Sequence, residues 1–129
     1  KSRAQSFTMT YDENNIFAKI LRGEIPCKKI YEDEFVLSFY DINPQKKIHA
    51  LVIPKGKYID LDDFAVNASD DEIVGLVKGI NKVAKKLNIT VDTGKGYRAL
   101  ANISEHGGQE VPHLHFHLFG GEKIGKMVL

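Results

Sequence analysis

Three histidines stand at alternate positions near the end of the chain, at His113, His115 and His117. In a β-strand successive side chains point to opposite faces, so all three imidazoles would share one face and the apolar residues between them the other. A helix would scatter the same three rings around its axis. Pro112 and the glycine pair at 120–121 bound the segment. The spacing predicts a strand over residues 112–119 whose apolar face needs a cover.

A long amphipathic helix could supply that cover. Ser69 and Glu72 have the spacing of a capping box, which predicts a helix that begins at residue 70 and ends at Asn88. Acidic residues lie in its first turn and lysines in its later turns, as the helix dipole favours. Its apolar residues recur every three or four positions, at Ile73, Leu76, Val77, Ile80, Val83, Ala84 and Leu87. We expect this stripe to pack on one face of a sheet.

The remaining elements are short. A helix is expected over 16–21, capped by Asn14 or Asn15 and stopped by Gly23. Strands are expected over 29–31, 35–40, 48–53 and 97–103, a short helical or irregular piece over 59–64, and a glycine-rich loop over 105–109. Short connections between consecutive strands favour antiparallel pairing, so the predicted fold class is α+β.

Composition bounds the class of protein. The 129 residues predict one domain, with a polar leader or expression remnant over 1–8 and a single domain over 9–129. A net charge of +1 does not indicate the excess of basic residues that is typical of nucleic-acid-binding proteins. No apolar run is long enough for a membrane span. Cys27 is the only cysteine, so no disulfide forms within the chain, and a reducing, cytoplasmic location is expected.

Three imidazoles on one face allow three interpretations. They form a solvated polar surface, a zinc site with three histidine ligands and one open position, or a catalytic site in which an imidazole attacks phosphorus. The spacing alone does not decide between the last two. Gly107 and Gly108 lie just upstream, and glycines let backbone N–H groups approach an anion closely. The loop is therefore either a phosphate cradle beside the imidazoles or a plain turn.

The pattern over 113–119, histidine alternating with apolar residues, is the signature of the histidine-triad (HIT) superfamily. The rest of the chain resembles its Hint branch, the histidine-triad nucleotide-binding proteins. Within that branch it resembles the bacterial members most. The resemblance covers residues 15–121 and rests on segments in the same order, at 16–20, 23–26, 31–33, 41–45, 49–55, 96–98, 102 and 107–109.

This resemblance implies a HIT fold, a five-stranded antiparallel sheet with one long and one short helix, in a homodimer. Gly75 and Gly79 on the long helix would permit close approach at the two-fold axis. The implied substrate is a purine nucleotide resembling AMP, and no metal or other cofactor is needed. His115 would attack the α-phosphorus, an amine would leave, and water would hydrolyse the nucleotidyl-histidine to a nucleoside monophosphate.

The same resemblance assigns the other site residues. His113 and His117 flank the nucleophile, and His49 supports them, although a satisfied core histidine is its alternative reading. Asp41 holds the ribose hydroxyls, unless it only caps the turn that follows. Asn102, Gly108 and Gln109 lie on the phosphate side. The nucleotide pocket would be lined by Ile16, Phe17, Ile20, Ile25, Phe39, Tyr40, Ile42 and Val111.

The chain departs from the better-known eukaryotic Hint enzymes in three ways. Glu110 replaces a serine that contacts phosphate, so its carboxylate must turn away, be protonated, or bind a cationic leaving group such as a lysine amine. Tyr40 replaces a histidine, and the tryptophan of the eukaryotic tail is missing. Three other functions stay open: a dinucleoside polyphosphate hydrolase, a zinc hydrolase with three histidine ligands, and a non-catalytic nucleotide-binding scaffold.

Overall fold

The computed structural model describes residues 10–127, so the leader expected over 1–8 and residue 9, the first of the expected domain, lie outside it. The helices are α2 (Ile16–Leu21), α3 (Leu61–Asn67), α4 (Asp70–Lys86), α5 (Val91–Gly94) and α6 (Ser104–Gly107). The strands are β1 (Lys29–Glu32), β2 (Val36–Tyr40), β3 (Ile48–Pro54), β4 (Arg98–Leu100) and β5 (Phe116–Gly120). No helix in this described part is long and apolar enough to cross a membrane.

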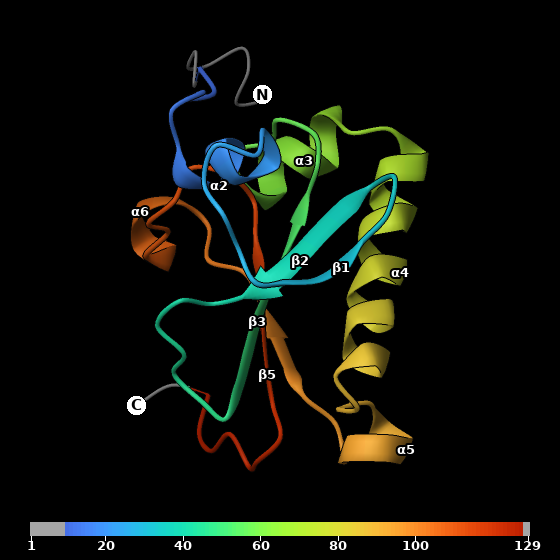
Figure 1. The fold of residues 1–129 in the computed structure, drawn as a ribbon. Coiled ribbons are helices and arrows are strands. Elements are labelled where there is room, and N and C mark those ends of the chain that lie inside the picture. Colours follow the sequence, from blue (N-terminus) through green and yellow to red (C-terminus); the bar gives the residue numbers. More distant parts are fainter. Residues whose placement is uncertain (1–9, 128–129) are drawn as a thin grey trace.

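The strands form one antiparallel sheet in the order β1-β2-β3-β5-β4, which confirms the α+β fold class (Figure 1). The central pair is β3 and β5, where Leu51 pairs with His117 and His49 pairs with Phe119. The register therefore brings a histidine of β3 next to the last histidine of the triad.

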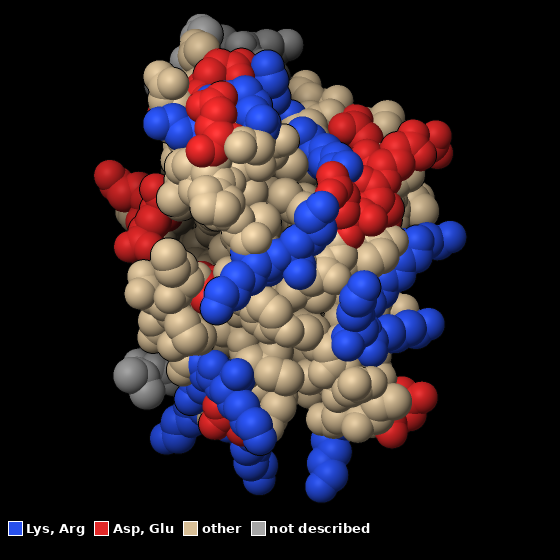
Figure 2. Space-filling model, in the orientation of Figure 1, with Lys and Arg blue, Asp and Glu red and all other residues tan. Residues whose placement is uncertain are grey.

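Helix α4 covers one face of the sheet, as the apolar stripe predicted (Figure 1). Ser69 accepts from the backbone N–H of Glu72 and the Glu72 carboxylate accepts from that of Ser69, so the capping box is present. Figure 2 shows acidic side chains around the start of α4 and basic ones further along it. The core beneath the helix contains Val36, Ala50, Val52, Leu76, Val83, Leu114 and Leu118.

The two helix glycines do not serve as predicted. Gly75 and Gly79 are buried against the chain's own sheet, where an added Cβ would meet the Phe35 ring at 2.5 Å and the Val36 side chain at 2.8 Å. They let α4 lie close to β2, so the face of α4 that carries the glycines is already covered by the chain's own sheet. Val77, predicted to belong to the buried stripe, is 64% exposed, because the glycines take the position facing the sheet.

A smaller core lies on the opposite face and supports the site. It contains Phe17 of α2 with Leu37, Phe39, Leu51 and Ile53. Helix α2 begins as expected, with the side chain of Asn15, not Asn14, accepting from the N–H of Ala18. The histidine rings pack against this core.

Several predicted boundaries are wrong. The strand expected over 112–119 begins only at Phe116, because the N–H of Leu114 bonds to Tyr58 and that of His113 to Val111, outside the sheet. The strand expected over 97–103 ends at Leu100, where the chain leaves β5, and the loop expected over 105–109 begins as the helical turn α6. The alternation still holds, since Leu114 and Leu118 face α4 while the histidine rings lie on the Phe17 side.

Candidate active site

His113 is completely buried and uses both ring nitrogens within the protein. Nε2 lies 2.9 Å from the carbonyl oxygen of Pro54, to which it donates its proton. Burial lowers the pKa of His113 to about 4, so the ring is neutral near pH 7 and carries only that proton. Nδ1 must then accept, and the hydroxyl of Tyr11 donates to it at 2.6 Å. Neither nitrogen is left for a metal or a phosphate.

His115 is held in the opposite tautomer. Its Nδ1–H donates to the carbonyl oxygen of His113 at 2.7 Å, which leaves the lone pair on Nε2. Burial lowers the pKa of His115, against the opposing effects of that carbonyl, Asp41 and Glu110. Within residues 10–127 no hydrogen bond uses Nε2. A neutral imidazole with a free, oriented lone pair is what nucleophilic attack requires.

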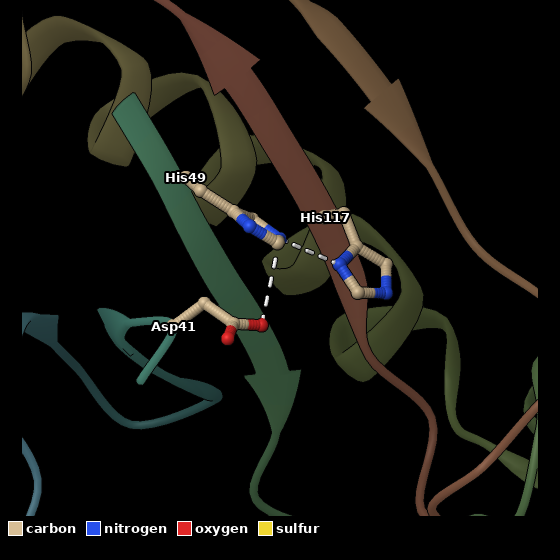
Figure 3. Close-up of side chains that lie close together, drawn as sticks. All are labelled: Asp41, His49 and His117. Carbon is tan, nitrogen blue, oxygen red and sulfur yellow. Dashed lines mark hydrogen bonds and ion pairs between the residues drawn. The ribbon is translucent and has the colours of Figure 1, made fainter. Parts of the chain in front are cut away.

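His49 and His117 are hydrogen-bonded to each other, and their proton positions are also fixed (Figure 3). The N–H of Gln45 donates to Nδ1 of His49 at 3.1 Å, so the His49 proton is on Nε2. Nε2 donates to Nδ1 of His117 at 2.9 Å, which places the proton of neutral His117 on its own Nε2. Burial lowers the pKa of His49, and burial with the neighbouring histidines lowers that of His117 to about 4.

The two carboxylate oxygens of Asp41 contact different groups. One oxygen accepts from the N–H of Asn43 at 2.8 Å and fixes the turn. The other lies 3.5 Å from Nε2 of His49. The turn-capping reading of Asp41 is therefore present in the geometry, whereas its contact with the ribose hydroxyls stays a prediction.

The ligand atoms of Asp41, His49 and His117 lie within 4.8 Å of one another, a spacing that a metal ion could bridge. The hydrogen bonds oppose this use. A metal on Nε2 of His49 would require the proton on Nδ1, which would then face the N–H of Gln45, donor against donor. Zinc bound by the three triad histidines is opposed as well, because both nitrogens of His113 are engaged.

The glycine-rich segment differs from the expected cradle. The N–H groups of Gly107, Gly108 and Gln109 donate to carbonyls of the same turn, so they are not turned toward an anion. The Gln109 side chain donates to the carbonyls of Ile59 and Val111 and accepts from the N–H of Ser104. Gln109 thus clamps α6 to the chain before α3, and contact of Gly108 or Gln109 with phosphate stays a prediction.

The predicted pocket residues fall into two groups. Phe17 and Phe39 are buried. The rings of Phe17 and His115 pack edge to face, with their centroids 4.9 Å apart. Ile16, Tyr40 and Ile42 are exposed, Ile42 by 90%. Partial burial is found for Ile20, Ile25, Val111 and Asn102. Their contact with a nucleotide also stays a prediction.

The predictions missed the groups that fix the tautomers. These are the Tyr11 hydroxyl, the Pro54 carbonyl and the Gln45 N–H. Two are backbone groups, which every residue carries, so no side-chain pattern marks them. Tyr11 lies before residue 15, where the resemblance begins.

Comparison with known proteins agrees with this geometry. Residues 22–124 match the HIT domain family. An uncharacterised HIT-like protein of Azospirillum brasilense is 53% identical over 119 residues, 92% of this chain and 95% of that protein. Purine nucleoside phosphoramidase of Escherichia coli K12 is 40% identical over 117 residues, 90% of this chain and 94% of the enzyme. A HIT family hydrolase structure from Clostridium thermocellum has a TM-score of 0.80 at 39% identity, covering 92% of this chain and 99% of that one. With its histidine triad leading into strand β5 of a five-stranded antiparallel sheet, the chain belongs to the HIT family.

Proposed function

We propose that this chain is a purine nucleoside phosphoramidase that works through a nucleotidyl-histidine intermediate. The observation that carries the proposal is the tautomer of His115, whose Nδ1–H donates to the His113 carbonyl and whose Nε2 accepts no hydrogen bond within residues 10–127. The 40% identity of the chain with the E. coli phosphoramidase supports a nucleotide hydrolase acting on P–N bonds.

In the first step Nε2 of His115 attacks the α-phosphorus, and the P–N bond to the leaving amine breaks. The departing nitrogen needs a proton, which Nε2–H of His117 is set to donate, because Nδ1 of that ring already accepts from His49. In the second step water attacks the same phosphorus and returns a proton to Nε2 of His117, and the bond to His115 breaks. The products are a free amine, a nucleoside monophosphate and regenerated enzyme.

The remaining site residues take supporting roles in the proposal. The Asp41 carboxylate binds the ribose hydroxyls, and the exposed side chains of Ile16, Tyr40 and Ile42 meet the base. Glu110 is exposed and close enough for its charge to act on His115. We therefore assign Glu110 to the leaving-group side, where a carboxylate favours a cationic amine.

We also propose that the chain is a cytoplasmic homodimer. In the sheet order β4 is an edge strand, and α4 exposes Val74 and Val77 on its outer side. The unpaired Cys27 suits a reducing compartment. Light scattering should give twice the mass of one chain, with Val77→Glu reducing it, whereas a monomer would contradict the dimer. Fractionation of cells should recover the chain with cytoplasmic markers and not with the envelope.

Product analysis tests the function. The purified chain is given adenosine 5′-phosphoramidate or a dinucleoside polyphosphate, and AMP and amine are quantified. We expect equal amounts of both from the phosphoramidate, and an AMP adduct on His115 in acid-free quenched samples analysed by mass spectrometry. Faster cleavage of the dinucleoside polyphosphate would favour that hydrolase class. Tight AMP binding without turnover would favour a scaffold.

A further inference from the structure

A tyrosine outside the family's matched segment reaches the centre of the site. Tyr11 precedes residues 22–124, yet its hydroxyl lies 2.6 Å from Nδ1 of His113. The two rings meet edge to face with centroids 5.6 Å apart. His113 itself is fully buried.

The segment that follows Tyr11 is held by hydrogen bonds and an ion pair. Asp12 accepts from the N–H of Asn14 through its side chain and from the N–H of Asn15 through its carbonyl. Glu13 binds the Lys57 ammonium at 2.9 Å, and its carbonyl accepts from Arg22 at 2.8 Å. Tyr11 therefore approaches His113 from an anchored stretch of backbone.

The direction of the hydrogen bond follows from the protons available. Neutral His113 has one ring proton, which goes to the carbonyl of Pro54, so Nδ1 must accept. Burial raises the pKa of Tyr11 above its usual value, so its phenol stays protonated and donates. Tyr11 and Pro54 thus hold the His113 ring at opposite nitrogens.

We propose that Tyr11 is a positioning residue for the nucleophile, acting through His113. The ring of His113 is fixed at both ends, and the carbonyl of the same residue accepts the Nδ1–H of His115 at 2.7 Å. Loss of the Tyr11 hydroxyl would release one end of the ring and leave a buried acceptor unpaired. The carbonyl that orients His115 would then be held less firmly. This inference rests on the proposed function.

The test is Tyr11→Phe, with Tyr31→Phe as the matched control. The Tyr31 hydroxyl donates to Asp33 in the β1–β2 turn, outside the site. In Tyr11→Phe we expect kcat for amine release to fall about tenfold, the factor that one lost hydrogen bond typically represents, with KM for the nucleotide unchanged. Tyr31→Phe should keep the wild-type kcat.

Nitrogen NMR of the histidine rings supplies a readout independent of turnover. The wild-type spectrum should show His113 protonated on Nε2, with Nδ1 hydrogen-bonded. In Tyr11→Phe the Nδ1 signal should move to the position of a nitrogen without a hydrogen bond. An unchanged Nδ1 signal, or a wild-type ring protonated on Nδ1, would overturn the proposal even if the variant is too unstable for kinetics.

The two proposals fail in different ways. A kcat for Tyr11→Phe equal to wild type, with the Nδ1 signal shifted, would show that the bond exists but does not position His115. No turnover by the wild type, with the expected NMR spectra, would contradict the proposed function and the catalytic role of Tyr11 while leaving the hydrogen bond itself established.

Discussion

At the scale of single residues, the site is defined by where four imidazoles carry their protons. His113 and His49 are protonated on Nε2 and turn Nδ1 to a donor, whereas His115 is protonated on Nδ1. The assignment of His113 depends on partners far away in the sequence, whereas the partners of His49 and His115 lie four and two residues away. The alternation of histidines predicted their shared face, but it could not predict these partners. Tyr11 and Pro54 are distant in sequence, and Gln45 acts through its backbone N–H, which no side-chain pattern marks.

The pH dependence of activity should reflect the neutral state of His115. Burial lowers the pKa of His115 below 6.5, so the acid limb of kcat/KM should lie below pH 6.5. The Glu110 charge opposes this effect, so Glu110→Gln should move the limb to still lower pH by a fraction of a unit. A steady-state pH profile of both proteins checks this, and a limb that moves upward in the variant would contradict it.

Glu110 should also affect the choice of leaving group. If its carboxylate receives a cationic amine, Glu110→Ser should lower kcat/KM severalfold for a lysyl phosphoramidate and much less for an uncharged one. Competition between the two substrates in one reaction measures the ratio directly. An equal effect on both substrates would refute this role.

At the scale of elements, the close approach of α4 to the sheet depends on its glycines. Gly75→Ala should destabilise the fold by about 1–3 kcal/mol through overpacking against Phe35, although alanine favours a helix by about 1 kcal/mol. Lys78→Ala, at an exposed position of the same helix, is the control and should change stability little. Urea unfolding of the three proteins tests this, and a stabilised Gly75→Ala would contradict the packing.

Elements with a local signal were the most predictable. The capping box predicted α4, and the pair Asn14 and Asn15 predicted the start of α2, where Asn15 is the cap. The ends of β4 and β5 depend instead on which backbone groups find partners across the sheet. The turn α6 was also missed, because glycines predict a loop while its N–H groups find carbonyls three to five residues back.

At the scale of the whole molecule, burying neutral histidines makes stability depend on pH. In the unfolded chain a histidine binds a proton below about pH 6.5, whereas folded His113 and His117 do so only near pH 4. As the pH falls, the unfolded state therefore binds protons at a higher pH than the folded state does. The free energy of unfolding should have its full value above pH 6.5 and fall as the pH drops toward 4.

For the fully buried His113 the loss corresponds to about 3 kcal/mol. Urea unfolding at a series of pH values measures it, and His106→Ala, at an exposed histidine, should leave the slope unchanged. A free energy of unfolding that is constant between pH 6.5 and 4.5 would contradict the assignment of neutral, buried rings.

The central claim is that His115 is a nucleophile that needs no metal. Its most direct test is release of amine from adenosine 5′-phosphoramidate in the presence of EDTA, with His115→Ala beside the wild type. Release by the wild type alone is the predicted result. Release that stops in EDTA and returns with zinc, or that persists in His115→Ala, would contradict the account.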